Sequence, residues 1–128
     1  MSTAATTLEV DQPQNLVVVR YRGRVGPKDT ERYLEEARAA LPKIQSAFRL
    51  LADLTELESM DLACAPHIES IMDMFNEKGV TTVVRVIPNP ARDIGLQIMS
   101  LFHYRQNVRI VTCATLDEAI NILASDEQ

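Results

Sequence analysis

Several residue types that would point to particular functions are rare or missing in this chain of 128 residues. It has no tryptophan, and only 5% of its residues are aromatic, which leaves little for a site that stacks bases or sugar rings. Basic residues are not in excess, because 13 Lys and Arg stand against 18 Asp and Glu, a formal net charge of -5. Nucleic acid and anionic membrane surfaces both attract basic proteins, so we expect neither as a partner.

Cysteine and histidine are also scarce, with two residues of each. Cys64 and Cys113 form no Cys-x-x-Cys pair, which favours a reduced, cytoplasmic protein. His67 and His103 have no metal-like spacing to each other or to a cysteine, so we expect no metal and no cofactor. Cys64 is either a reactive thiol near a helix start or a small buried residue, and we favour the buried role.

Long apolar runs are absent as well. None approaches the roughly 20 residues of a membrane-spanning helix. Residues 1–7 lack a basic segment followed by an apolar one, so we expect no secretory signal. What remains is the composition of a globular protein, with 46% hydrophobic and 24% charged residues. The length fits a single domain over residues 1–128.

The hydrophobic pattern predicts strands that alternate with helices. We predict strands over residues 7–10, 16–22, 49–55, 80–87 and 108–113. We predict helices over residues 29–44, 66–75, 89–105 and 115–123. The first two strands should form an antiparallel hairpin, and strands joined through helices should be parallel. The predicted fold is therefore α/β, with a mixed sheet of four to five strands and about four helices.

Prolines and a glycine set the expected helix ends. Pro42 should end or bend the first helix, and Gly79 should close the second as its C′ residue. Pro66 suits a first helical turn, so the second helix should start at about residue 65 or 66. Residues 56–65 then form a predicted polar loop between the central strand and this helix. Such loops lie at the carboxyl edge of a sheet, where open α/β folds usually place their sites.

We take this loop and the following helix start as a candidate partner-binding site. Leu62 would be its contact point if it stands exposed at the loop tip, and a core residue if it folds inward. Two hydroxyls, Ser59 and Thr55, are candidates for phosphorylation, although a structural use is the plainer reading because nearby acidic residues would repel a phosphate. The candidate partner-binding residues are Ser59, Met60, Asp61, Leu62, Ala63, Cys64, Ala65 and His67.

Four segments together resemble the sulphate-transporter and anti-sigma-factor-antagonist (STAS) domain, over about residues 14–124. Residues 16–25 are similar to its opening strand and glycine turn, and residues 52–55 (Ala-Asp-Leu-Thr) to its central strand. Residues 60–65 fall where the family has an Asp-Ser-x-Gly loop, and residues 113–119 match its last strand and helix. In this comparison Asp61 matches the aspartate, Leu62 replaces the serine and Cys64 replaces the glycine.

The resemblance implies a bacterial, cytoplasmic regulatory module without catalytic activity. In the bacterial antagonists a kinase phosphorylates the loop serine, which switches binding to an anti-sigma factor. This chain resembles a divergent member that lacks that serine, so its implied partner is a protein, such as an anti-sigma factor or a kinase-like regulator. STAS-like domains also serve as transporter accessory subunits, so a role with a small molecule or lipid stays open.

Other patterns leave further alternatives. The acidic residues Glu56, Glu58 and Asp61 would carry acid–base chemistry in an enzyme, but an acidic rim is the simpler explanation. Residues 23–26 look like a fragment of a phosphate-binding loop, without the lysine that such loops carry. A homodimer would use residues 16–22 as an edge strand, or a stripe on the helix over residues 89–105. One strand face carries the three alternating arginines Arg20, Arg22 and Arg24, which form either an anion-binding patch or a solvated surface. Asp53, at the end of the central strand, should cap nearby amides.

Overall fold

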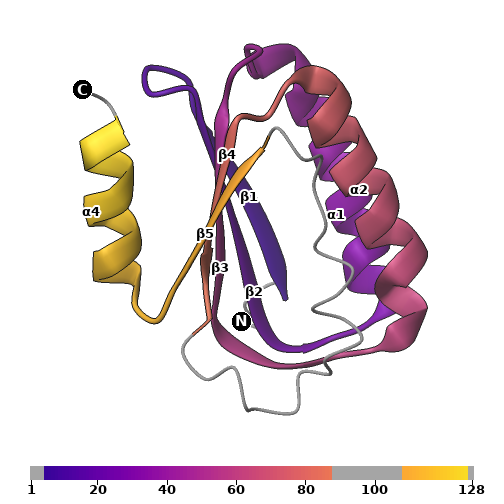
Figure 1. Ribbon diagram of the computed structural model, residues 1–128. Coiled ribbons are helices and arrows are strands. Elements are labelled where there is room, and N and C mark those ends of the chain that lie inside the picture. Colours follow the sequence, from indigo (N-terminus) through magenta and orange to yellow (C-terminus); the bar gives the residue numbers. More distant parts are fainter. Residues whose placement is uncertain (1–4, 88–107, 127–128) are drawn as a thin grey trace.

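A mixed five-stranded sheet carries helices on both faces in the computed structural model, which describes residues 5–87 and 108–126 (Figure 1). The strands are β1 (Thr6–Asp11), β2 (Leu16–Val25), β3 (Arg49–Met60), β4 (Thr82–Val86) and β5 (Arg109–Cys113). The described α-helices are α1 (Pro27–Ala40), α2 (Ala65–Lys78) and α4 (Leu116–Asp126). Short 3₁₀ turns occupy Leu41–Lys43 and Leu62–Cys64. The predicted helix over residues 89–105 lies outside the described residues.

The sheet order is β1-β2-β3-β4-β5, with β1 antiparallel to β2 and the other neighbours parallel. This confirms the predicted mixed α/β sheet with an N-terminal hairpin. One detail of the prediction is wrong. Residues 16–22 do not form an edge, because β2 lies between β1 and β3. β2 rather than β1 is internal because β2 pairs along its length with β3. This pairing joins residues distant in the chain, so the sequence pattern does not reveal it.

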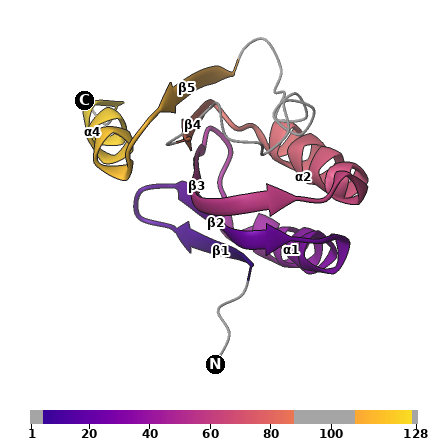
Figure 2. The same ribbon diagram turned by 90° about the horizontal axis from the view of Figure 1, so that it is seen from below.

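Two apolar cores lie on the two faces of the sheet. Of the described helices, Figures 1 and 2 show α1 and α2 together on one face and α4 on the other. Side chains alternate along each strand, so β2 sends Val17 and Val19 toward α1 and α2 while Leu16 contributes to the α4 side. In the larger core the rings of Phe48 and Phe75 meet edge to face, with centroids 5.7 Å apart. This ring pair fixes α2 against the start of β3.

β2 and β3 continue past the end of β4. Val86, the last residue of β4, pairs with Asp53, whereas β2–β3 pairing continues to Val25 opposite Met60. The result is a two-stranded extension that curves toward the start of α2 (Figure 1). Gly23, with a φ of 63°, lies at one of two register shifts along this pairing. A positive φ suits glycine, which can bend the strand there at little steric cost.

The extension corrects the predicted loop over residues 56–65, since residues 56–60 continue β3. The irregular pairing breaks the simple alternation that identifies a strand. Leu57 and Met60 are both buried although they are three positions apart, while Glu56 and Glu58 are exposed. Only residue 61 and the 3₁₀ turn at residues 62–64 separate β3 from α2.

The helix ends agree with the predicted signals. α1 ends at Ala40 and passes into a 3₁₀ turn that contains Pro42. α2 begins at Ala65 with Pro66 in its first turn, and it ends at Lys78, followed by the capping residue Gly79, whose φ is 102°. Thr115 caps α4, because its hydroxyl oxygen accepts the Glu118 amide at 3.2 Å.

Gly79→Ala should lower the free energy of unfolding by about 1–2 kcal/mol, because alanine is strained at positive φ. The new Cβ would also lie 3.3 Å from the Ser46 Cβ. The neighbouring Ala47 has a φ of 62° without being glycine, and its amide donates to the Gly79 carbonyl at 2.9 Å. Ala47→Gly should therefore raise stability by about 0.5 kcal/mol, as the relieved strain exceeds the added chain entropy. Urea unfolding measures both, and equal losses in the two variants would contradict the assignment of strain.

Candidate interaction site at the ends of β2 and β3

An exposed turn closes the two-stranded extension at the carboxyl ends of β2 and β3. Three consecutive residues, Asp61, Leu62 and Ala63, are exposed to solvent, and Leu62 keeps 57% of its surface accessible. The residues on either side, Met60 and Cys64, are buried. We call residues 61–63 the cap turn. It presents a leucine to solvent between two buried anchors, so Leu62 does not fold inward.

Hydrogen bonds hold the cap turn in one conformation. The Asp61 amide donates to the Val25 carbonyl at 3.0 Å, which ties the turn to the end of β2. The Asp61 carboxylate accepts the Ala63 amide at 2.9 Å, and the Asp61 carbonyl accepts the Cys64 amide at 2.9 Å. Asp61 thereby acts as the N-cap of the 3₁₀ turn, a role for which aspartate is well suited. The order of the cap turn comes from these bonds rather than from burial of Leu62.

The Cys64 thiol is an internal anchor of this site. Its side chain is 0% exposed, and the sulfur donates to the Val25 carbonyl at 3.7 Å. Burial raises the pKa of the Cys64 thiol, and the negative charges of Asp61 and Asp29 raise it further against the opposing hydrogen bond with Thr30. A buried thiol that resists ionisation is a poor nucleophile. The structure thus confirms the preferred reading of Cys64 as a small buried residue.

The start of α1 lies beside the cap turn. Its Gly26 amide donates to the Asp29 carboxylate at 2.8 Å, so a protein carboxylate already occupies the end of the helix where an anion would bind. The Thr30 hydroxyl is 2.8 Å from Nδ1 of His67, which links α1 to α2. His67 is only half-buried and thus borders the surface around the cap turn. Residues 23–26 serve as a bulge and a helix cap rather than as a phosphate loop.

The two candidate phosphorylation residues have different surroundings. Thr55 is exposed, and both its amide and its hydroxyl donate to the Asp53 carboxylate. Asp53 thus caps a neighbouring amide, as expected. Ser59 is half-buried within β3 and lines a shallow hollow of about 380 Å³ next to the cap turn. The hollow is bordered by Arg24, Val25, Gly26, Ser59, Met60 and Asp61.

Ion pairs join some of the charged side chains along β2 and β3. Arg22 lies 2.8 Å from the Glu56 carboxylate, and Arg20 lies 3.6 Å from Asp53. The three strand arginines therefore do not form a common anion-binding patch. Of the three acids considered for acid–base chemistry, Glu56 pairs with Arg22 and Asp61 accepts the Ala63 amide, whereas Glu58 is exposed. Arg24 is exposed at the rim of the hollow beside the cap turn.

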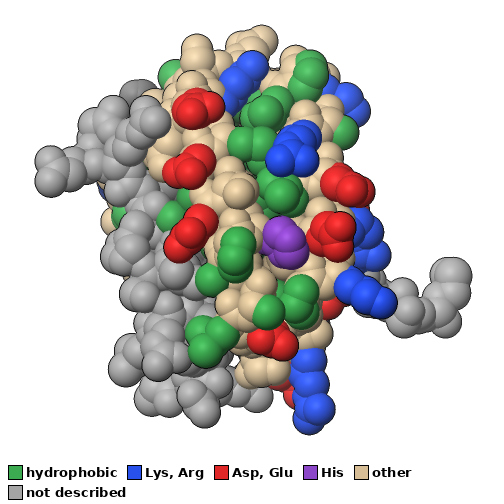
Figure 3. All heavy atoms as spheres, turned by 90° about the vertical axis from the view of Figure 1, so that its right-hand side faces the viewer, with side chains coloured by type: hydrophobic (Ala, Val, Ile, Leu, Met, Phe, Trp, Pro, Cys, Tyr) green, Lys and Arg blue, Asp and Glu red, His purple; other side chains and the backbone are tan. Residues whose placement is uncertain are grey.

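The outer face of α1 and α2 continues the surface around the cap turn. Figure 3 shows hydrophobic side chains gathered along this face, with acidic side chains on both sides. On α2 the exposed acids Glu69, Asp73 and Glu77 recur every four residues and so share one side of the helix. The surface is therefore apolar along its middle, acidic along one border and of mixed charge along the other (Figure 3).

The sequence analysis missed the contribution of β2 and α1 to this site. Arg24, Val25 and Gly26 border the cap turn, and Thr30 supports it from α1. The predicted topology could have indicated this contribution, because the carboxyl ends of neighbouring parallel strands meet at one edge of a sheet. Of the two histidines, His103 lies outside the described residues. Within residues 5–87 and 108–126, no three potential metal ligands come together and no helix is long and apolar enough to cross a membrane.

Solved structures resemble this fold, whereas the sequence matches no protein-family model and no curated protein. The unphosphorylated form of the anti-sigma factor antagonist SpoIIAA aligns over 94% of this chain and 98% of its own, with a TM-score of 0.65 and 17% identity. A protein with a SpoIIAA-like fold from Shewanella loihica aligns over 96% and 98%, with a TM-score of 0.66 and 17% identity. An anti-sigma factor antagonist from Mycobacterium paratuberculosis aligns over 96% and 97%, with a TM-score of 0.57 and 16% identity.

This likeness establishes the fold. The chain has the SpoIIAA-like α/β architecture, and the resemblance predicted from four short segments is confirmed at that level. The alignments extend over nearly the whole chain and nearly the whole of each neighbour.

Cys64 should react with iodoacetamide at least about 100-fold more slowly than a free thiol at pH 8, because the thiol is buried and neutral. Ala63→Cys is the matched control, since it places an exposed thiol on the adjacent residue. Mass spectrometry of the labelled peptide reads both rates. Because the Cys64 thiol has a higher pKa in the folded state, its neutral form contributes stability at any pH below the pKa of the unfolded thiol. This stability is lost as the pH rises through the pKa of the folded thiol. Fast labelling of Cys64 in the native protein at pH 8 would contradict the assignment.

Proposed function

We propose that the chain is a non-catalytic regulatory module of the bacterial cytoplasm that binds a protein partner through the cap turn. The observation that carries this proposal is the exposure of Leu62 on a turn fixed at both ends. Burying such a side chain in a partner contributes roughly 1.5–3 kcal/mol. Because the turn is already ordered, little conformational entropy is lost on binding.

The surroundings of Leu62 define the partner's chemistry. Asp61 and Glu58 are exposed close to it in sequence, and the exposed acids of α2 border the same face of the molecule. A complementary partner offers an apolar pocket for Leu62 with basic residues around it. An anti-sigma factor or a kinase-like regulator is the partner class we propose, which is supported by neighbours that are themselves anti-sigma factor antagonists.

Regulation of this module should differ from a serine phospho-switch. Leu62 stands at the position that the resemblance assigns to the phosphorylated serine, and leucine accepts no phosphate. The Thr55 amide donates a hydrogen bond to the Asp53 carboxylate. A phosphate on Ser59 would lie next to Glu58 and two residues from Asp61 along the chain. Like-charge repulsion from Asp61 and Glu58 disfavours that modification, and only Arg24, the cross-strand neighbour of Ser59, opposes this repulsion among the residues that border the hollow. We therefore propose a module that stays in one binding state.

Leu62→Asp should weaken partner binding by about 1.5–3 kcal/mol, because it removes the apolar contact and adds charge. The partner is captured from bacterial lysate on the immobilised chain, identified by mass spectrometry and then titrated as a purified protein. Ile120→Asp is the matched control, since Ile120 is 52% exposed on α4, across the sheet from α1 and α2. Equal affinity of the Leu62→Asp variant and the unaltered chain would refute the cap turn as the binding site.

A second candidate function is a small-molecule or lipid-binding accessory role, such as in a transporter. It is favoured by a groove of about 420 Å³ between α4 and the sheet. Apolar side chains dominate its lining, and Arg20 lies at its polar end already paired with Asp53. The lining residues are Gln14, Leu16, Val18, Arg20, Leu51, Leu116, Ile120, Leu123 and Ala124.

Val18→Trp separates this candidate from the first, because the larger side chain fills the groove far from the cap turn. If the groove binds amphipathic acids, the variant should lose the fluorescence enhancement of an anionic naphthalene sulfonate probe about tenfold, since buried apolar contact drives such binding. Glu35→Trp, at an exposed position of α1 outside this groove, should leave the signal unchanged. Lack of enhancement with the unaltered chain would rule out the groove as a ligand site.

A further inference from the structure

The outer edge of β1 is an open strand edge. β1 is first in the sheet order, and no strand in the described part of the chain pairs with its outer side. The Arg22 amide donates to the Ala5 carbonyl at 2.8 Å, which fixes the alternation along β1. Ala5 and every second residue after it direct their backbone groups to β2. The backbone N–H and C=O groups of Thr6, Leu8 and Val10 therefore point outward.

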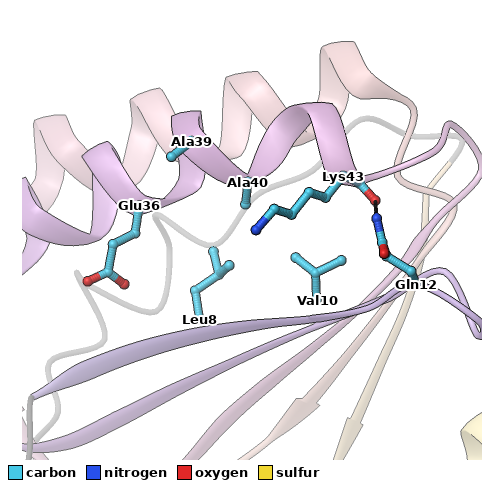
Figure 4. Close-up of a pocket in the computed structure, with 7 residues that line it drawn as sticks. All are labelled: Leu8, Val10, Gln12, Glu36, Ala39, Ala40 and Lys43. Atoms are coloured by element: carbon cyan, nitrogen blue, oxygen red, sulfur yellow. Dashed lines mark hydrogen bonds between the residues drawn. The ribbon is translucent and has the colours of Figure 1, made fainter.

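A hollow lies above this edge on the α1 side. It measures about 500 Å³ and is bordered by half-buried Leu8 and Val10 below and by α1 above (Figure 4). Figure 4 shows Glu36 toward the amino-terminal half of β1 and Lys43 toward its carboxyl-terminal half. The edge thus combines outward-pointing backbone groups, two apolar side chains and opposite charges at opposite ends. Glu36 also lies 3.7 Å from Arg32 of the same helix, in an exposed ion pair that contributes little and leaves the carboxylate accessible.

We propose that β1 pairs with β1 of a second copy of this chain, antiparallel and around a two-fold axis at Leu8. Leu8 then faces the partner's Leu8, and Thr6 faces the partner's Val10. All of these residues have outward backbone groups, so each facing pair exchanges two hydrogen bonds. The two sheets become continuous, and the leucines and valines of both copies fill the two hollows beside α1.

Two features favour this register: the axis at Leu8 pairs all three outward-facing residues of each copy, and charge disfavours the next register toward the carboxyl end of β1. With the axis at Leu8, Glu9 faces the partner's Thr7, and no acidic residue faces another. An axis at Glu9 would place the two Glu9 side chains opposite each other, which is destabilising. The two-fold rotation also exchanges the ends of the strand, so Glu36 comes to lie beside the partner's Lys43 on both sides of the axis. This self-complementarity points to a second copy rather than to an unrelated peptide.

The charges allow a test that separates interface loss from misfolding. Glu36→Lys alone and Lys43→Glu alone each place like charges across the axis and should weaken the dimer roughly tenfold. An equimolar mixture of the two variants restores opposite charges in the heterodimer, so it should associate more tightly than either variant alone. The double variant, with both charges exchanged, should associate like the unaltered chain. Sedimentation velocity at up to roughly 100 µM measures all four samples, a range suited to a small interface.

Hydrogen exchange on the unaltered chain gives an independent measurement. The amides of Thr6, Leu8 and Val10 should become protected as protein concentration rises, while those of Thr7 and Glu9, already bonded to β2, should not change. A monomer throughout the concentration range would overturn the proposal. So would concentration-dependent protection confined to other strands, or a mixture of charge variants that associates no better than its components. None of these results bears on partner binding by the cap turn.

Discussion

The parallel pairing of β2 with β3 is the interaction on which the rest of the structure depends. It begins at Leu16 opposite Arg49 and continues, through two register shifts, to Val25 opposite Met60. Because this pairing continues beyond the end of β4, the cap turn lies away from the rest of the sheet and close to α1 and α2. The Asp61 amide completes the pairing by bonding to Val25. The exposure of Leu62 is thus a consequence of backbone geometry several residues away.

The distribution of charge follows from the same pairing. It sets Arg20 beside Asp53 and Arg22 beside Glu56, while Arg24 and Glu58 stay exposed. Such partly exposed pairs contribute little to stability, at most about 1 kcal/mol each. Their effect is to leave the apolar tip at Leu62 as the feature available for recognition. The exposed acids Glu58 and Asp61 lie close to this leucine in sequence and have no basic partner among the ion pairs of the described residues.

The sequence predicted the sheet, its mixed character and most element bounds, because hydrophobic periodicity and helix-end residues act locally. Gly79 at positive φ and Pro66 in a first helical turn are read directly from residue type. The loop over residues 56–65 was only partly correct, since the register shifts of β3 conceal its strand character. The place of β2 inside the sheet was also missed, because strand order depends on contacts between residues distant in the chain.

For the site, the sequence by itself determined that a short polar connection with a leucine in place of a serine precedes a proline-started helix. It also determined a formal net charge of -5, from which we predict that nucleic acid is not a partner. Only the tertiary structure decided that Leu62 faces solvent while Cys64, two residues later, faces the core. The physical reason is that side-chain direction after an irregular strand depends on its partner strand. Here that partner is β2, whose Val25 carbonyl receives both the Asp61 amide and the Cys64 thiol.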